Sequence, residues 1–250
     1  MKKDYHIHSY FSKDSKLNPE ELIKKAIELN YQEIAFTDHL EFLFPQWSFH
    51  EEYSYQEFYD FFTSLKAKYV SKIKILRGIE VGEYQQTKAQ VLDYFGDLKP
   101  DIILGSVHTL LPNRDISLPF DQPLSEKEIV AYYKENLKLV EDCHIDVLAH
   151  LGIFTRYLPH NIKAGLPVCR DIFQVMKEKK IALEINYSGL RKSTKQIIPH
   201  FEVLELYASQ GGSLISMASD THQLSDFDDN YDQVIRILEQ NKYGFIVVNP

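Results

Sequence analysis

The sequence predicts an α/β fold in which parallel strands alternate with helices and close into a barrel. Short runs rich in Ile, Val, Leu and Phe alternate with longer segments of helical period along the chain. Seven such runs, and an eighth candidate, fit into 250 residues, a length that barrels commonly use in one domain. No linker, repeat or low-complexity tract interrupts them, so residues 1–250 are expected to form a single domain.

The expected strands follow one another at regular intervals, at residues 4–7, 33–37, 73–79, 101–107, 145–149, 181–185, 213–219 and, as the eighth candidate, 245–248. The clearest helix begins at Pro19, because Asn18 can cap its first turn and Glu21 can reach back to the cap. Further helices are expected at residues 54–70, 125–140, 167–179, 199–209 and 230–241. Because parallel strands joined by helices form right-handed crossovers, this order favours a closed barrel over an open two-domain sheet.

Composition disfavours several classes of function. Asp and Glu total 36 against 28 Lys and Arg, a net charge of −8, which makes nucleic acid an unfavoured partner. No apolar run approaches the roughly 18 residues that span a bilayer, and no signal-peptide pattern follows Met1. Cys143 and Cys169 provide neither a disulfide framework nor a CxxC zinc site, as in a reducing compartment. We expect a soluble, cytoplasmic protein without a membrane partner, and its oligomeric state stays open.

Polar side chains gather at the carboxyl ends of the expected strands. Six of the ten histidines stand there with carboxylates, in the segments His6-Ile7-His8, Asp38-His39, Glu80, His108, His150, Glu184-Ile185-Asn186 and Asp220-Thr221-His222. In a parallel barrel these ends converge on one mouth. Alternation along a strand points His6 and His8 to the same side, which suits two ligands of one metal. So many imidazoles and carboxylates are costly to bury unless cations neutralise them, which predicts a metal site.

Other polar and aromatic residues receive different interpretations. Glu184 is expected to hydrogen-bond a ligand histidine rather than bind metal, and Glu83 is expected at the surface. Aromatic side chains after His39, among them Phe44 and Trp47, either pack within their loop or wall a substrate pocket. The remaining histidines stand in loop or helix contexts and are expected to be solvated, namely His50, His144, His160 and His200.

These segments resemble the signatures of the polymerase and histidinol phosphatase (PHP) family, and specifically its stand-alone histidinol-phosphatase branch. The matching stretches cover nearly the whole chain in the family's order: His6-Ile7-His8-Ser9, Thr37-Asp38-His39, Arg77-Gly78-Ile79-Glu80, Gly105-Ser106-Val107-His108, Ala149-His150-Leu151-Gly152, Leu183-Glu184-Ile185-Asn186 with Ser188-Gly189, and Ser219-Asp220-Thr221-His222. The resemblance implies a distorted (βα)7 TIM-like barrel that holds three divalent metal ions.

The resemblance also implies which residues bind the three ions. The ligand sets are His6, His8, Glu80 and Asp220 for the first, Glu80, His108 and His150 for the second, and Asp14, His39 and His222 for the third. Glu80 bridges the first two ions. Asp14 departs from relatives that often carry a histidine in this loop, and it could instead cap a turn. Mixed nitrogen and oxygen ligands suit zinc, manganese or iron, and the sequence does not choose among them.

Clustered divalent ions suit phosphomonoester hydrolysis, because they neutralise phosphoryl oxygens and lower the pKa of a bridging water that attacks as hydroxide. The chain lacks GxSxG, GxxxxGK[ST] and GxGxxG motifs, which leaves water as the nucleophile. Arg156 and Arg191 lie on loops leaving the expected barrel mouth and resemble the branch's phosphate-binding arginines. Residues after His39 are expected to accept a positively charged leaving group by ion pairing and cation–π contact, namely Glu41, Phe44 and Trp47.

The resemblance therefore implies a metal-dependent phosphomonoesterase that hydrolyses L-histidinol phosphate to L-histidinol and phosphate in histidine biosynthesis. Two alternatives stay open. A phosphodiesterase or exonuclease is one, and a basic groove is then expected. A non-catalytic metal-binding regulatory module is the other, and the arginine pair is then dispensable. The group that protonates the leaving alcohol is not identified by the sequence.

Overall fold

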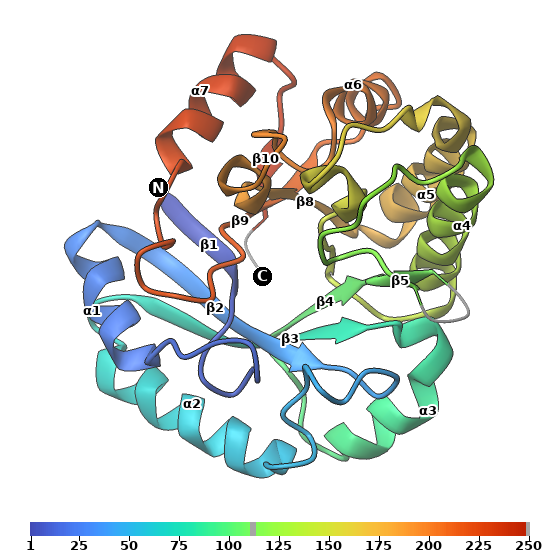
Figure 1. The fold of residues 1–250 in the computed structure, drawn as a ribbon. Helices are drawn as coiled ribbons and strands as arrows, with labels where there is room; N and C mark the ends of the chain where they lie inside the picture. The colour runs from blue at the N-terminus through green and yellow to red at the C-terminus, as the bar shows by residue number, and fades with distance from the viewer. Residues whose placement is uncertain (111–113, 249–250) are drawn as a thin grey trace.

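Parallel strands form a curled sheet at the centre of the molecule. The structure is a computed structural model that describes residues 1–110 and 114–248. Eight strands stand side by side in chain order: β1 Lys2–Ile7, β2 Tyr31–Leu40, β3 Lys74–Gly82, β4 Ile102–Ser106, β7 Val147–Leu148, β8 Ala182–Asn186, β9 Leu214–Ala218 and β10 Ile246–Val247. Every neighbouring pair is parallel. Figure 1 shows the strands around a common centre with the helices outside them. The α/β fold of a distorted TIM-like barrel is confirmed.

The ring closes on β1 by a few contacts, from the segment after β9 and from the residue after β10. The backbone N–H of Asp220 donates to the carbonyl of His6, and that of His8 donates to the carbonyl of Thr221, both at 2.9 Å. Nearer the start of β1, the Tyr5 hydroxyl donates to the carbonyl of Val248, just after the short strand β10, at 3.2 Å. The closure is therefore irregular compared with the ladders between the other strands, and this irregularity distorts the barrel.

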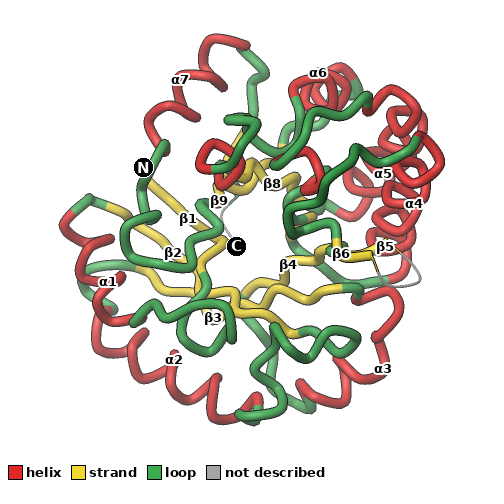
Figure 2. Tube along the Cα trace, in the orientation of Figure 1, coloured by secondary structure: helices red, strands yellow, loops and turns green. Residues whose placement is uncertain are grey.

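Helices cover the outside of the sheet in the described part of the chain (Figure 2). Their bounds are α1 Pro19–Glu28, α2 Tyr55–Tyr69, α3 Tyr84–Phe95, α4 Glu126–Asp142, α5 Leu166–Lys179, α6 Phe201–Ser209 and α7 Tyr231–Asn241. The Asn18 side chain caps α1 as expected, accepting the backbone N–H groups of Glu20 and Glu21 at 2.9 and 3.3 Å. Short 3-10 turns also occur, and those at Ile153–Arg156 and Ser188–Arg191 carry the two candidate phosphate ligands.

Two elements were not expected from the sequence. Helix α3 follows Glu83, which has a left-handed backbone with φ of 46° and makes no side-chain cap, so the usual start signal is missing. The second element is an antiparallel hairpin of β5, Thr109–Leu110, and β6, Arg114–Asp115. Its two strands have only two residues each, too few for hydrophobic alternation to show in the sequence.

The barrel interior is filled below the carboxyl ends of the strands. Apolar side chains from successive strands pack together there: Tyr5, Ala35, Leu76, Ile102, Leu104, Val147, Ala149 and Ala182. A larger apolar cluster lies between the strands and the surrounding helices. The polar strand ends therefore rest on a packed core rather than on an open channel. Among the described helices, none combines the length and the apolar character that a membrane crossing requires.

Candidate metal centre

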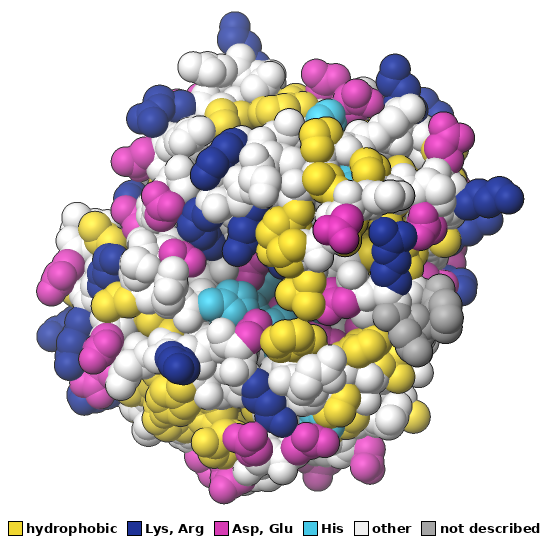
Figure 3. Space-filling view, in the orientation of Figure 1, with side chains coloured by type: hydrophobic (Ala, Val, Ile, Leu, Met, Phe, Trp, Pro, Cys, Tyr) yellow, Lys and Arg dark blue, Asp and Glu magenta, His cyan; other side chains and the backbone are white. Residues whose placement is uncertain are grey.

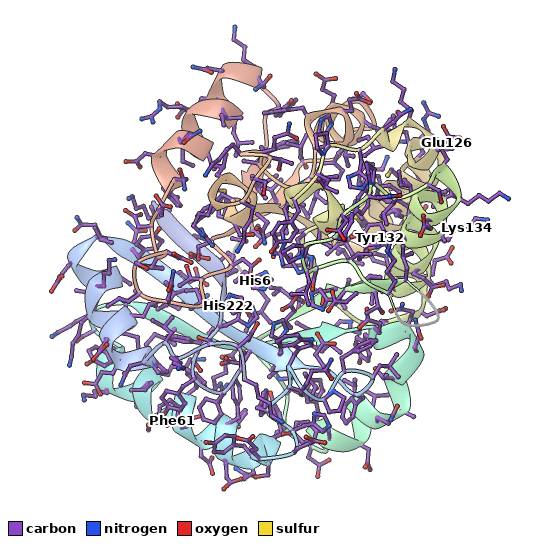
Figure 4. All side chains as sticks on the ribbon, viewed as in Figure 1. His6, Phe61, Glu126, Tyr132, Lys134 and His222 are labelled. Carbon is purple, nitrogen blue, oxygen red and sulfur yellow. The ribbon has the colours of Figure 1, made fainter. Side chains whose placement is uncertain are left out.

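The nine candidate ligands meet at the carboxyl ends of the strands. β1 ends beside His6, and the register of β2 and β3 pairs His39 with Glu80, so these two residues are neighbours across the sheet. The ligands after β4, β7 and β9 converge on the same end of the barrel. Figure 4 places His6 and His222 near the centre of the ring, and Figure 3 shows histidine at the bottom of a hollow.

Glu80 lies between two pairs of imidazoles. Its Oε2 atom is 3.2 Å from Nε2 of His6 and 3.5 Å from Nε2 of His8. Its Oε1 atom is 2.8 Å from Nε2 of His150 and 3.3 Å from Nε2 of His108. Oε2 also lies 3.0 Å from Nδ1 of His39, so Glu80 stands between the two histidine pairs and beside a fifth imidazole. This arrangement fits a carboxylate that bridges cations.

The spacing within each pair fits two ligands on one ion. The Nε2 atoms of His6 and His8 are 3.0 Å apart, and those of His108 and His150 are 3.3 Å apart. Zinc–nitrogen bonds of about 2.0–2.1 Å in a tetrahedral arrangement separate two ligand nitrogens by roughly 3.3 Å. In addition, Oε2 of Glu80 is buried without a hydrogen-bond partner among the described residues. Since an unpaired buried carboxylate oxygen is unfavourable, the donor set fits divalent cations.

A third group of ligands lies closer to solvent. Oδ2 of Asp14 is 3.0 Å from Nε2 of His222 and 3.6 Å from Nε2 of His39. The rings of His8 and His222 stack at 4.1 Å, and nitrogens of His8, His39 and His222 lie close enough together to hold one ion. Asp220 faces the His6–His8 pair, with Oδ1 at 3.6 Å from Nε2 of His8. Asp14 therefore points into the histidine cluster.

Side chains behind the ligands hold the imidazole rings in place. Nδ1 of His6 lies 2.8 Å from Oε2 of Glu184, whose other oxygen accepts the backbone N–H of His150 at 3.0 Å. Nδ1 of His108 lies 2.9 Å from Oε1 of Glu41. Such partners fix the orientation of a ligand ring and increase its basicity. Glu184 thus lies beside the candidate ligand His6, on the side of the ring away from Glu80.

Glu83 differs from its expected position at the surface, because it is buried. Its Oε1 atom accepts the backbone N–H groups of His108 and Thr109 at 2.7 and 3.0 Å, and the Thr109 hydroxyl at 3.0 Å. Burial, reinforced by the nearby Glu41 carboxylate, raises the pKa of Glu83 to about 8. The expectation of an exposed Glu83 was therefore wrong. The bonded backbone is 25 residues away, so no local pattern could have revealed this contact.

The remaining histidines lie outside the cluster. His144 is exposed as expected, whereas three others are only half exposed. The ring of each of these three makes a hydrogen bond two residues away in its own segment. The partners are the Ser48 hydroxyl for His50, the Leu158 carbonyl for His160 and the backbone N–H of Glu202 for His200.

Neighbouring groups favour the ionised form of Glu80 and the neutral form of His8. Burial opposes ionisation of Glu80, but the imidazoles of His6, His39 and His108 hold its pKa well below the usual range. Burial, together with the rings of His222 and His39, holds the pKa of His8 well below its usual value. Metal ligands must be ionised carboxylates or neutral imidazoles, so Glu80 and His8 are prepared for this role. At His6, His39 and His108 burial opposes protonation, but the surrounding carboxylates raise the pKa well above its usual value, so a cation that binds there must displace protons.

A pocket opens above the cluster at the mouth of the barrel. Its apolar wall comes from loops at the barrel mouth and consists of Phe44, Trp47, Leu118 and Ile153. Arg156 also lines the pocket, where Nη1 is 3.6 Å from Oδ2 of Asp220 and Nε donates to the Ser117 carbonyl at 3.2 Å. Figure 3 shows Lys and Arg side chains along one edge of the hollow and hydrophobic side chains along another.

Arg191 and Glu41, two candidate substrate-binding residues, direct their charged groups at protein atoms rather than into the pocket. Nη2 of Arg191 donates to the carbonyls of Ser219 and Asp220 at 2.7 and 3.2 Å. The described lining of the pocket includes Arg156 but not Arg191. Glu41 borders the pocket, yet its side chain is 1% exposed and its Oε1 atom faces Nδ1 of His108. The position of Glu41 thus differs from that of a free acceptor for a charged leaving group.

Comparison with known proteins extends over almost the whole chain. The sequence profile of the PHP domain matches residues 4–188. A histidinol-phosphatase of Lactococcus lactis is 29% identical over 231 residues, which cover 89% of this chain and 85% of that protein. A probable histidinol-phosphatase of Thermotoga maritima is 26% identical over 246 residues, or 98% of this chain and 95% of that protein.

A solved structure is similar over the same extent. It is the histidinol phosphate phosphatase of Lactococcus lactis in complex with zinc, L-histidinol and phosphate, with a TM-score of 0.82 and 26% identity. The similarity covers 99% of this chain and 95% of the solved chain. The family profile ends before Asp220 and His222, but these full-length similarities reach the part of the barrel that carries them.

Proposed function

Because the chain belongs to the PHP domain family, we propose that it is a metal-dependent histidinol-phosphatase, which hydrolyses L-histidinol phosphate to L-histidinol and phosphate. The observation that carries the proposal is Glu80, whose two oxygens face two histidine pairs at the floor of a pocket lined by Arg156. The similar Lactococcus lactis enzyme was solved with both products of this reaction and with zinc. We also propose that residues 1–250 act as one domain, since strands from both ends of the chain contact each other.

We propose three divalent ions, held by the ligand sets His6, His8, Glu80 and Asp220, then Glu80, His108 and His150, then Asp14, His39 and His222. Zinc, manganese and iron all suit these nitrogen and oxygen donors. When bound, such ions neutralise the phosphoryl oxygens and lower the pKa of water toward neutrality.

The chain's own residues bind and orient the substrate. Arg156 is placed to donate from its planar guanidinium to a phosphate oxygen, because the Ser117 carbonyl and Asp220 hold it at the pocket wall. Phe44 and Trp47 are placed to cover the alcohol part of the substrate and to exclude water. Arg191 supports the backbone that carries Asp220, and we propose that its guanidinium also contributes positive charge to the phosphate end.

The experiment that tests this function compares kcat/KM for three substrates under the same metal and salt conditions. L-histidinol phosphate is expected to exceed both bis-p-nitrophenyl phosphate and single-stranded DNA. A chain of net charge −8 whose pocket is lined, among the described residues, by one arginine, Arg156, can neutralise one phosphate group well but not a phosphate strand. Faster cleavage of the diester or of DNA would make the protein a nuclease. No turnover of any ester by the fully metal-loaded protein would favour a non-catalytic module.

A further inference from the structure

Among the described residues, five carboxylates border the pocket: Asp14, Glu41, Glu80, Asp115 and Asp220. Four of them face imidazole nitrogens at distances between 2.8 and 3.6 Å. Asp115 differs, because its Oδ1 atom accepts the backbone N–H and the hydroxyl of Ser117 at 2.8 and 2.7 Å. Within residues 1–110 and 114–248, its Oδ2 atom has no hydrogen bond or ion pair. Oδ2 of the half-buried Asp115 is thus available to a ligand, whereas Oε2 of Glu41 and of Glu80, which also lack hydrogen-bond partners, are buried.

Asp115 is held firmly beside the metal centre. It stands on β6 and pairs with Thr109 of β5, the residue directly after the candidate ligand His108. The next residue, Ile116, is fully buried and donates its backbone N–H to the carbonyl of His108 at 2.8 Å. Because the hairpin register is fixed from both sides, the Asp115 carboxylate has a defined distance from the ligand cluster.

The same short segment holds the guanidinium proposed to bind phosphate. The carbonyl of Ser117 accepts hydrogen bonds from Nε and Nη2 of Arg156. The Asp115 carboxylate and the Arg156 guanidinium are therefore connected through the backbone of Ile116 and Ser117. Leu118 and Ile153 add apolar surface beside them. This wall is complementary to a small ester that carries a phosphate and, a few bonds away, a positively charged amine above an apolar part.

A carboxylate close to a phosphate site also acts against other substrates. Its charge repels a phosphate dianion, so it weakens binding of esters whose alcohol is neutral or negative. For an ester with an ammonium group, the attraction offsets this repulsion. Glu41, which was expected from the sequence to accept a cationic leaving group, faces His108 instead.

We propose that Asp115 is a specificity-determining residue that binds the ammonium group of the substrate's alcohol part and thereby selects amino-alcohol phosphates. The proposal rests on the phosphatase function proposed above. Binding leaves the reaction itself unchanged: Asp115 orients the alcohol while the phosphate lies at Arg156 and the metal centre.

The test uses Asp115→Asn, which keeps an oxygen for Ser117 but removes the charge. Two pairs of esters that differ only by the amine are compared: L-histidinol phosphate with 3-(imidazol-4-yl)propyl phosphate, and phosphoethanolamine with ethyl phosphate. We expect the kcat/KM preference for the cationic ester of each pair to fall by about 10- to 100-fold, the scale of one charge-assisted hydrogen bond. The inhibition constant of L-histidinol should rise in parallel, and that of inorganic phosphate should not. Metal content, measured by elemental analysis, should match the wild type.

Two control variants separate specificity from other effects. Asp121→Asn removes the same charge from an exposed position six residues further along and should leave the preference unchanged. Ser117→Ala removes one hydrogen-bond donor to Asp115, and it should lower kcat/KM about equally for the two esters of a pair. If Asp115→Asn lowers kcat/KM equally for both esters of a pair, Asp115 only shapes the hairpin and the proposal is wrong.

The result also distinguishes this proposal from the proposed function. If the wild type fails to hydrolyse L-histidinol phosphate but prefers phosphoethanolamine over ethyl phosphate, and Asp115→Asn removes that preference, Asp115 has the assigned role and the named substrate is wrong. If the wild type hydrolyses L-histidinol phosphate and Asp115→Asn keeps the preference, the function stands and the role of Asp115 falls.

Discussion

The floor and the rim of the metal centre are held in different ways. On the floor, the side chains of His6, His8 and Glu80 are fully buried, whereas on the rim those of Asp14 and His222 remain 28% exposed. The candidate floor ligands stand at strand ends with further side chains behind their rings, while Asp14 and His222 of the rim stand on loops. Buried charges gain more from a cation than exposed ones, because water does not screen them. The floor should therefore bind metal tightly and as a unit, and the rim more weakly and independently.

The largest effect is expected from Glu80→Gln. Removing this charge takes an oxygen ligand from both histidine pairs at once, so two ions should be lost together. Turnover of L-histidinol phosphate should fall by about 1,000-fold or more, the scale of several kcal/mol of metal stabilisation. Elemental analysis and kcat measured on the same preparation check both outcomes.

Glu33→Gln is the matched control for Glu80→Gln. Glu33 is also a buried strand carboxylate, but it pairs with Lys74 at 2.7 Å rather than with histidines. It should lower the midpoint of thermal unfolding without lowering metal content. Loss of only one ion in Glu80→Gln would contradict the bridging role, and a single ion per fully reconstituted wild-type chain would contradict the three-ion centre.

Arg156→Ala should produce the next largest effect, on the pocket wall above the floor. It removes charge-assisted hydrogen bonds to a dianion, so KM and the inhibition constant of phosphate should rise by about 10- to 100-fold at unchanged metal content. Arg191→Ala should weaken phosphate inhibition less, because this guanidinium donates to the carbonyls of Ser219 and Asp220. Steady-state kinetics with phosphate as inhibitor compares the two variants. If neither variant changes KM or phosphate inhibition, these loops do not form the phosphate site.

The floor was far more predictable from sequence than the pocket wall. Hydrophobic runs locate the strands, and parallel strands necessarily bring their carboxyl ends together, so the sequence pattern alone groups His6, Glu80 and His150. No comparable rule predicts where the side chains of loop residues lie. Glu83 and Asp115 owe their roles to backbone partners that tertiary packing supplies. Glu41 was recognised as a site residue, but its contact with His108 depends on how two loops meet, which periodicity does not encode.

Glu184→Gln tests whether the side chains behind the rings matter to the floor. The amide cannot accept as strongly at Nδ1 of His6, so the ring loses basicity and orientation. We expect the affinity for one floor ion to fall by about tenfold, measured by competition with a chelator. Asn186→Ala, which removes a donor to Glu184 at 2.8 Å but keeps the carboxylate, should give a smaller loss. An unchanged chelator profile in Glu184→Gln would mean that burial alone positions His6.

The smallest effect on the floor is expected from Asp14→Ala, on the rim. Asp14 contacts only the third ligand group, and its partial exposure lets water and salt screen the charge it contributes. The variant should lose one of the proposed three ions and keep the two that Glu80 bridges. Titration with a chelator should show this ion leaving first in the wild type and already missing in the variant. Asp229→Ala, a carboxylate on the loop before α7, is the control for lost charge. Simultaneous release of all ions from Asp14→Ala would show that floor and rim bind metal as one unit.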